Sequence, residues 1–453
     1  MKNCLVEYNV NVPVKNVAQL SFSIDNCSVT TENDAESTTF KISILCQLKN
    51  YQSITDSTIL VRAKYLSILG IISFLIDEPL DVFGHSSHKK IIDSPPNLNS
   101  DAIYIKENTD YTQTLSELIN KIIDSTTHEK EFIFSLLDRW RKARYLEKET
   151  EENLIFNDEA TLSYFHVLEL LGNTSSSEIK NDSKILTEEF LRKYNDIILS
   201  LPSSTIENEV TLKTKLISSI LDKDISVYSK ITFFLKKYEL FDDRTSYWVK
   251  NLIESRNSVA HGRRVYYNKA IYPVQPFFPL ISNDIYPLYF LRIFIAKVIA
   301  NYLGIKSFES DWIQVHAFLN PGEHATKTFL SSKQFEQPHS LSGLNSSIIF
   351  GGLNELVLSK KIKISNCIEF YKFYLKSKID MEKFVYLNSH ALSLLLDLPI
   401  DDNVAQFIFT TFKLINSSGH KYHINFRDLF YDLDFHNFKA NKLEDLISSR
   451  DLC

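Results

Sequence analysis

Hydrophobic and polar residues alternate along the first part of the chain, from Leu5 to about Ile76. Stretches 20–24 and 40–44 place apolar residues at every second position, and polar clusters such as 31–36 separate the runs. A period of two is typical of strands with one buried face. The pattern predicts a small, mainly antiparallel β domain, which ends where paired prolines in the turn-rich segment 93–101 exclude a helix.

Beyond Tyr111 the apolar residues take the spacing of helices, and a strongly apolar run at 288–303 follows a proline-rich loop. After about Lys306 the pattern is mixed, with a polar loop region at 320–347 and then amphipathic helices such as 381–396 and 426–433. The long helices predicted before that point are 115–123, 131–148, 158–171, 188–199, 213–221, 225–238 and 245–261.

These patterns predict an α+β fold that is mainly α, in three parts. We expect a β-rich N-terminal domain over 1–105, an all-α helical bundle over 106–305, and a mixed, mostly helical C-terminal domain over 306–453. The length of 453 residues suits two or three domains with separate cores. In this arrangement the two terminal domains flank the helical bundle and would sense or restrain it.

Charge and cysteine content narrow the possible environments and partners. The net charge of −6 means that any nucleic acid must be bound by a local basic patch. The five cysteines are widely spread without a CxxC pair, which favours a reducing cytoplasm. The first residues lack the apolar stretch of a secretory signal, and the apolar window 66–76 is about half of the ~20 residues that a membrane-spanning helix needs. We therefore expect a cytoplasmic protein without membrane contact.

The strongest functional signal is the run Arg-Asn-Ser-Val-Ala-His at 256–261. Its helix is predicted to start near Asp243 or Thr245, either of which can cap the free amides, and to stop at Gly262. His261 then lies in the last turn, where the outward carbonyl groups favour a positively charged imidazole. That position suits a histidine that exchanges protons.

On a helical wheel Arg256 falls in the centre of an apolar stripe. A guanidinium there is costly unless an anion meets it, so a subunit interface that holds an anion would satisfy both demands. His261 lies about 140° away, which favours a site completed by a second copy of the chain. The apolar stripe comprises Val249, Leu252, Ile253, Val259 and Ala260, and the polar stripe comprises Lys250, Glu254, Asn257 and His261.

Arg-Asn, three variable residues and His at the end of a long helix resemble the RxxxxH signature of the HEPN superfamily. The preceding helices resemble its early pair, with Trp140 and Ala143 in one and 164–171 in the next, and 288–303 looks like its closing helix. The resemblance covers about 110–305. It implies a HEPN-like helical domain that forms a homodimer, with two motif helices meeting around one scissile phosphate.

The resemblance also implies a metal-independent endoribonuclease that needs no cofactor. One His261 would take the proton from the ribose 2′-hydroxyl while the other protonates the leaving oxygen. Arg256 would hold the phosphate, and Asn257 would orient the imidazole or the substrate. Arg263 and Arg264 follow directly, either as grips for flanking phosphates or as a solvated cationic cap.

Further candidates are less specific. Tyr267 would stack on a base or pack within its loop, and Glu169 is an accessory candidate on a helix that could face the motif helix. The HxxH spacings at 85–88 and 420–423 lack further ligands, so we expect no metal. No phosphate-binding loop, esterase elbow or dinucleotide fingerprint occurs in the sequence.

The function expected from these residues is cleavage of RNA, with tRNA as one candidate substrate. The resemblance implies a toxin or anti-phage effector of abortive infection, triggered by a phage or host protein. Two alternatives stay open: a non-catalytic HEPN module that dimerises and binds RNA or protein, and a sensor or scaffold whose function lies in the terminal domains. A purely structural role also stays open, with Arg256 paired to Glu254 or another carboxylate and His261 exposed to solvent.

Overall fold

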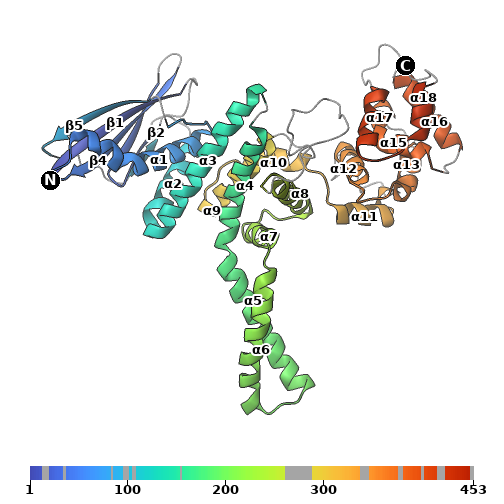
Figure 1. The fold of residues 1–453 in the computed structure, drawn as a ribbon, viewed down its shortest axis with the longest axis horizontal. Helices are drawn as coiled ribbons and strands as arrows, with labels where there is room; N and C mark the ends of the chain where they lie inside the picture. Colours follow the sequence, from blue (N-terminus) through green and yellow to red (C-terminus); the bar gives the residue numbers. More distant parts are fainter. Residues whose placement is uncertain are drawn as a thin grey trace. The chain divides into compact units, whose positions relative to one another are not determined.

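The chain folds into two units, Met1–Leu240 with Tyr286–Ile313 and Phe241–Ile285 with Gln314–Cys453, each described here by itself. The architecture comes from a computed structural model (Figure 1). It describes residues 1–12, 20–33, 37–82, 85–94, 101–104, 109–153, 156–260, 288–336, 346–375, 381–398, 402–415 and 424–448.

The first unit opens with a six-stranded sheet in the order β5-β1-β4-β3-β2-β6. All paired neighbours are antiparallel, and buried residues alternate with more open ones along β2, as predicted. Strand β3 shows the same alternation and extends to Asn33, so the predicted polar cluster 31–36 is wrong in its first part. Asp25 and Asn26 join β2 to β3 with positive φ at both positions, as a tight hairpin turn requires. The strands are β1 (Lys2–Val12), β2 (Leu20–Ile24), β3 (Cys27–Asn33), β4 (Thr38–Leu48), β5 (Ser86–Ile92) and β6 (Asp101–Tyr104).

A long helix, α1 (Ser57–Ile76), packs on β1 and β4 of this sheet and on α3 (Thr127–Asn153). The predicted β pattern up to Ile76 is therefore wrong beyond Leu48. Helix α1 is buried on both sides, so its last three turns are apolar all round and show no helical stripe. The stretch Ile54–Ile76 is long and apolar enough to cross a membrane, and 56% of its apolar window is buried inside the structure.

Beside α1, the first unit has a bundle of α3, α4, α7 and α9 and a separate helix pair, α5 with α6. Helix α3 packs against α4, α4 packs against α7 and α9, and α5 pairs with α6 (Figure 1). Trp140 of α3 and Tyr164 of α4 meet in the core with ring centroids 5.5 Å apart. Besides α1 and α3, the helices of this unit include α2 (Thr109–Asp124), α4 (Asn157–Thr174), α5 (Ser176–Lys193), α6 (Ser203–Asp224), α7 (Val227–Lys237) and α9 (Leu288–Leu303), with a π-helical turn at Tyr194–Ile198.

The described elements of the second unit are helices around an aromatic core that includes Phe335, Phe370, Tyr371 and Phe384. The predicted polar loop 320–347 contains a helix, α11, so that prediction is wrong in part. The helices are α8 (Asp243–Ala260), α11 (Glu323–Ser331), α12 (Ser346–Leu358), α13 (Ile368–Leu375), α14 (Met381–Leu387), α15 (Ser389–Leu396), α16 (Asp402–Ile415), α17 (Phe426–Phe435) and α18 (Asn441–Ser448). Helix α10 (Glu309–Phe318) contains the boundary between the units.

The fold class is confirmed as α+β and mainly α. The two units group the chain differently from the three parts expected at 1–105, 106–305 and 306–453. The sheet and the helical bundle share one unit because α1 packs on both. The motif helix α8 belongs with the C-terminal helices because Tyr247 lies in their core.

Candidate functional site

Helix α8, which carries the motif, begins at Asp243 as predicted, but its cap is Asp242. The Asp242 carbonyl accepts the Ser246 amide at 2.9 Å, and its carboxylate Oδ1 accepts the Thr245 amide at 2.8 Å. The Asp243 carboxylate instead accepts the Gly322 amide at 2.6 Å. The predicted capping role of Asp243 or Thr245 is therefore wrong, because Asp243 faces the segment before α11.

A contact between Asp242 and His316 adds to this cap. His316 Nε2 lies 2.6 Å from Asp242 Oδ2. Burial would raise the pKa of Asp242, but hydrogen bonds from His316 and from Thr245 outweigh it and lower that pKa to about 2. Arg244 Nη1 also donates to the His316 carbonyl at 3.3 Å. The start of α8 is thus fixed to the last turn of α10.

The first half of α8 is also fixed to the C-terminal helices, through Tyr247. Its hydroxyl donates to Glu355 Oε1 at 2.9 Å, and the other carboxylate oxygen accepts the Asn320 amide at 2.7 Å. The Lys361 ammonium lies 4.8 Å from the centroid of the Tyr247 ring and 3.2 Å from Asn251 Oδ1. One side of α8 is therefore bound along its first nine residues.

The apolar stripe is confirmed where side chains are described. Val249 and Leu252 are buried and Ile253 is half-buried, while Lys250 and Glu254 of the polar stripe are exposed. The side chains of Val259 and Ala260 lie outside the described residues.

Arg256 and Asn257, the first two motif residues, lie close together near the end of α8. Both side chains are half-buried, and Arg256 Nη1 donates to Asn257 Oδ1 at 3.1 Å. We had expected Asn257 to orient the imidazole or the substrate. In this arrangement its oxygen is used by Arg256, and its amide N–H groups are the donors for other roles.

The other predicted site residues are distributed as follows. His261, Arg263, Arg264 and Tyr267 lie outside the described residues. Glu169 lies half-buried on α4 of the first unit, whereas α8 belongs to the second. Among the described residues, no three or more His, Cys, Asp or Glu side chains are grouped as metal ligands.

The first unit contains a buried cluster of charges that the sequence did not suggest. Arg144 of α3 is 5% exposed, and its guanidinium contacts Glu147 Oε2 at 2.7 Å, Asp77 Oδ1 at 3.1 Å and the Asp77 carbonyl at 2.8 Å. Arg292 of α9 adds contacts to the same two carboxylates, at 3.2 Å to Asp77 and 3.7 Å to Glu147. The Tyr164 hydroxyl donates to Glu147.

Burial sets the protonation of this cluster. It raises the pKa of Asp77 to about 6, although Arg144 and Arg292 act in the opposite direction. It also raises the pKa of Tyr164 well above its usual value. Two guanidinium groups face two carboxyl groups, so the charges balance within the cluster and none is left to attract an anion. We read the cluster as a structural link between α1, α3, α4 and α9, signalled in the sequence only by Arg144 and Glu147 at i, i+3 beside Trp140.

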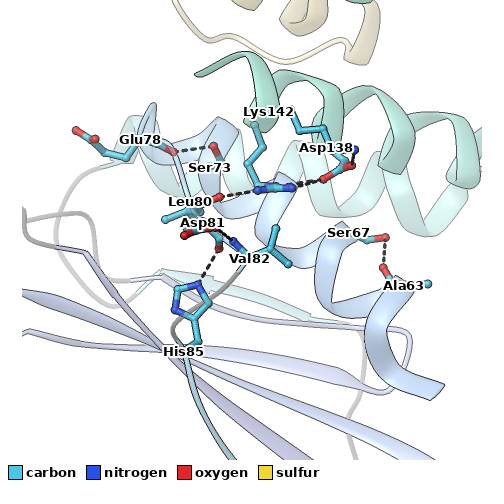
Figure 2. A network of polar contacts seen from close by, with 11 residues as sticks. Ala63, Ser67, Ser73, Glu78, Leu80, Asp81, Val82, His85, Asp138 and Lys142 are labelled. Carbon is cyan, nitrogen blue, oxygen red and sulfur yellow. Dashed lines mark hydrogen bonds and ion pairs between the residues drawn. The ribbon is translucent and has the colours of Figure 1, made fainter. Parts of the chain in front are cut away.

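A second link fixes the segment after α1 (Figure 2). Arg141 is 3% exposed and donates to Asp138 Oδ1 at 3.1 and 2.8 Å and to the Leu80 carbonyl at 2.6 Å. Ser73 donates to the Glu78 carbonyl at 2.6 Å, and His85 Nε2 lies 2.7 Å from the Asp81 carbonyl. These contacts give His85 a local hydrogen-bonding role.

The residues with the clearest chemical meaning are therefore Arg256 and Asn257 on an anchored helix, followed in sequence by His261. The resemblance to the HEPN signature rests on the amino-acid sequence of this run alone. No family model, curated protein or solved structure matches this chain.

Proposed function

We propose that this chain is a HEPN-type, metal-independent endoribonuclease that cleaves RNA at a site shared by two copies of the chain, and that it acts as a toxin or anti-phage effector of abortive infection. The observation that carries the proposal is the contact of Arg256 with Asn257 near the end of an anchored helix. The sequence places His261 one residue beyond the described end of α8. Helices α3, α4 and α9, whose sequences resemble other HEPN helices, pack together in the first unit.

The proposed reaction is an internal transfer at phosphorus. One His261 accepts the proton of the ribose 2′-hydroxyl, and the 2′-oxygen attacks the adjacent phosphorus. The bond from phosphorus to the 5′-oxygen breaks, and the His261 of the second copy donates a proton to that oxygen. The products are a 2′,3′-cyclic phosphate and a 5′-hydroxyl, with no net oxidation or reduction.

Arg256 serves this reaction by stabilising the charge that grows on the phosphate. A guanidinium presents a planar fork of donors that matches two phosphate oxygens. The hydrogen bond to Asn257 engages Nη1, which fixes the plane of the fork before RNA arrives. A preorganised donor of this kind is worth about 10²–10³-fold in rate.

The test is cleavage of RNA by the purified full chain with EDTA present. We expect His261→Ala to reduce cleavage by at least about 100-fold, Arg256→Ala to reduce it similarly, and Lys250→Ala to leave it unchanged. Lys250 is the matched control because it is an exposed cation on the same helix. Cleavage that survives in the His261 variant, or that EDTA abolishes in the wild type, contradicts the proposal and favours the non-catalytic binding module.

A further inference from the structure

Helices α5 and α6 form a hairpin within the first unit, residues 176–224, called the α5–α6 hairpin below (Figure 1). Arg192 and Glu207 pair across it near the turn at 3.2 Å, and Lys180 and Asp222 pair near its other end at 3.4 Å. These two contacts establish that the helices run antiparallel. Its buried contact residues are few: Thr187, Leu191, Asn195, Val210 and Thr214.

The hairpin leaves large apolar side chains open to solvent. Besides Ile197 and Ile198 of the π-helical turn, five of them are 56% to 69% exposed: Leu186, Phe190, Leu212, Leu216 and Ile220. Large apolar side chains therefore stand at exposed positions of the helices, while the buried positions include threonines and an asparagine. Soluble monomers rarely expose contiguous apolar patches of more than a few hundred Å².

The apolar residues of the two helices lie on the same side of the hairpin. In α5, Leu186 and Phe190 stand one position before the buried residues Thr187 and Leu191. On a helical wheel each therefore lies about 100° from its buried neighbour, in the direction of the preceding residue. In α6 the exposed apolar residues are Leu212, Leu216 and Ile220, and the buried stripe is Val210 and Thr214. On the wheel the apolar residues lie about 140° from the buried stripe, again in the direction of the preceding residue. In each helix the exposed apolar residues are thus rotated away from the buried residues in the same sense, viewed along that helix from its N-terminus. Because the helices are antiparallel, this rotation brings the exposed apolar residues of both to one side, which we call the apolar side of the hairpin.

We propose that the apolar side of the α5–α6 hairpin docks on the same surface of a second copy of this chain, forming a two-fold, four-helix dimer interface. The exposed apolar area of this side suits a second copy of the chain. At roughly 150–200 Å² for each fully open side chain, the five residues on this side alone expose about 500–600 Å² per chain, a large part of the roughly 800 Å² per partner of a stable interface. Packing of helix pairs in this way is the architecture of four-helix bundles.

The charges of the hairpin also favour a second copy over other occupants. It carries seven Lys or Arg and nine Asp or Glu, so both signs are present and the net charge is −2. RNA and anionic lipid surfaces both require an excess of cations around the contact face. A mixed, nearly balanced surface can meet its own copy with opposite charges at the rim.

This inference goes beyond the proposed function and does not require it, because the hairpin lies outside the motif helix. It names a surface that would hold two chains together whether or not they cut RNA. A monomeric wild type would contradict both proposals, because the proposed ribonuclease site is shared by two copies. A dimer that cuts no RNA contradicts only the ribonuclease, and a chain that cuts RNA but stays dimeric in the hairpin variant contradicts only this interface.

The experiment measures the mass of the full chain by light scattering during size-exclusion chromatography. We expect the wild type at twice the chain mass of 52.4 kDa and the double variant Phe190→Glu with Leu216→Glu at the mass of one chain. Two carboxylates placed in an apolar interface should raise the dimer dissociation constant by at least about 100-fold. The matched control, Asn181→Glu with Thr211→Glu, adds the same charges on the opposite side of the hairpin and should remain dimeric.

Circular dichroism verifies that both double variants are folded. If the test variant fails to fold, hydrogen exchange of the wild type gives the answer, because dimerisation should protect the amides of 185–199 and 212–221 more strongly at high protein concentration. A monomeric wild type, a dimeric Phe190/Leu216 variant, or protection that does not depend on concentration overturns the proposal. The first of these results would assign the apolar side to a different protein.

Discussion

Replacing Arg144 by Met would remove the central cation of the buried cluster in the first unit. Arg144 contacts Glu147 and both the carboxylate and the carbonyl of Asp77. Methionine fills a similar volume without charge, so the variant changes electrostatics more than packing. The two carboxyl groups then share a single cation, Arg292, which lies 3.7 Å from Glu147.

The size of the effect follows from burial. Removing one partner of a buried ion pair costs about 3–5 kcal/mol, because the remaining charge has lost its compensation. We expect about 4 kcal/mol at pH 7.5 rather than the upper limit, since the Asp77 side chain is 29% exposed and keeps some contact with water. A loss of this size is a large part of the stability of a single folded unit.

The pKa of Asp77 gives this prediction a pH dependence. Because that pKa is raised to about 6, above its usual value, folding draws a proton onto Asp77 between about pH 4 and pH 6. The stability that this protonation contributes is present at low pH and is lost as the pH rises through 6. At pH 5 Asp77 is mostly neutral, so the Arg144 variant leaves less uncompensated charge, and its cost should fall to about 2 kcal/mol.

The assay is urea unfolding of the full chain, followed through hydrogen exchange of α1 and α3. A local probe is needed because two units need not unfold in one step. Lys142→Met is the matched control, since Lys142 is 62% exposed on the same helix. The reasoning is refuted if the Arg144 variant loses no more stability than the Lys142 variant, or if its loss is greater at pH 5 than at pH 7.5.

Three further changes test other contacts. Gly70→Ala should lower stability by about 1–3 kcal/mol in thermal unfolding, because a Cβ there would lie 3.0 Å from backbone atoms of α3; an unchanged melting temperature would contradict the close approach of α1 and α3. Asp242→Asn keeps a cap but loses the charge, so it should cost at most about 1 kcal/mol at pH 7, given that the carboxylate is 45% exposed. The pKa of Asp242 in the folded chain is lowered to about 2, so the stability that wild type has over this variant should disappear as the pH falls from 4 to 2. A stability difference that persists at pH 2 would contradict the contact between Asp242 and His316. Glu355→Ala should lower RNA cleavage by about 10-fold through a misplaced α8, with partial rescue by Glu355→Gln, which keeps an acceptor for Tyr247; equal activity of the two variants would argue against this positioning role.

The hydrophobic pattern predicted the strands and helices whose burial gives a regular pattern in the sequence. Stretches 20–24 and 40–44 lie in β2 and β4, whose buried residues alternate with more open ones, so alternation showed them, and 288–303 was predicted with the bounds of α9 itself. Helix α1 was missed because it is buried between the sheet and α3, which erases both periodicities. A helix that is apolar all round cannot be distinguished from a buried strand by pattern alone.

Contacts between distant residues explain what the sequence could not show of the site. The wheel placed Val249 and Leu252 on the packed stripe, and both are buried. It could not show that Tyr247 binds Glu355, which is 108 residues away and groups α8 with the C-terminal helices. The sequence analysis did not single out Arg144 and Glu147, because only the fold encloses their charges.

The anchoring of α8 has a consequence for control of the proposed site. Its contacts through Asp242 and Tyr247 lie in the first part of the helix, whereas Arg256 follows Asp242 by fourteen residues, about 21 Å along the axis. A rigid helix fixed at one end turns small movements of that end into larger movements of the other. If the proposed site is controlled by a second protein, binding of that protein to the second unit near Glu355 is expected to shift the two motif residues without touching them.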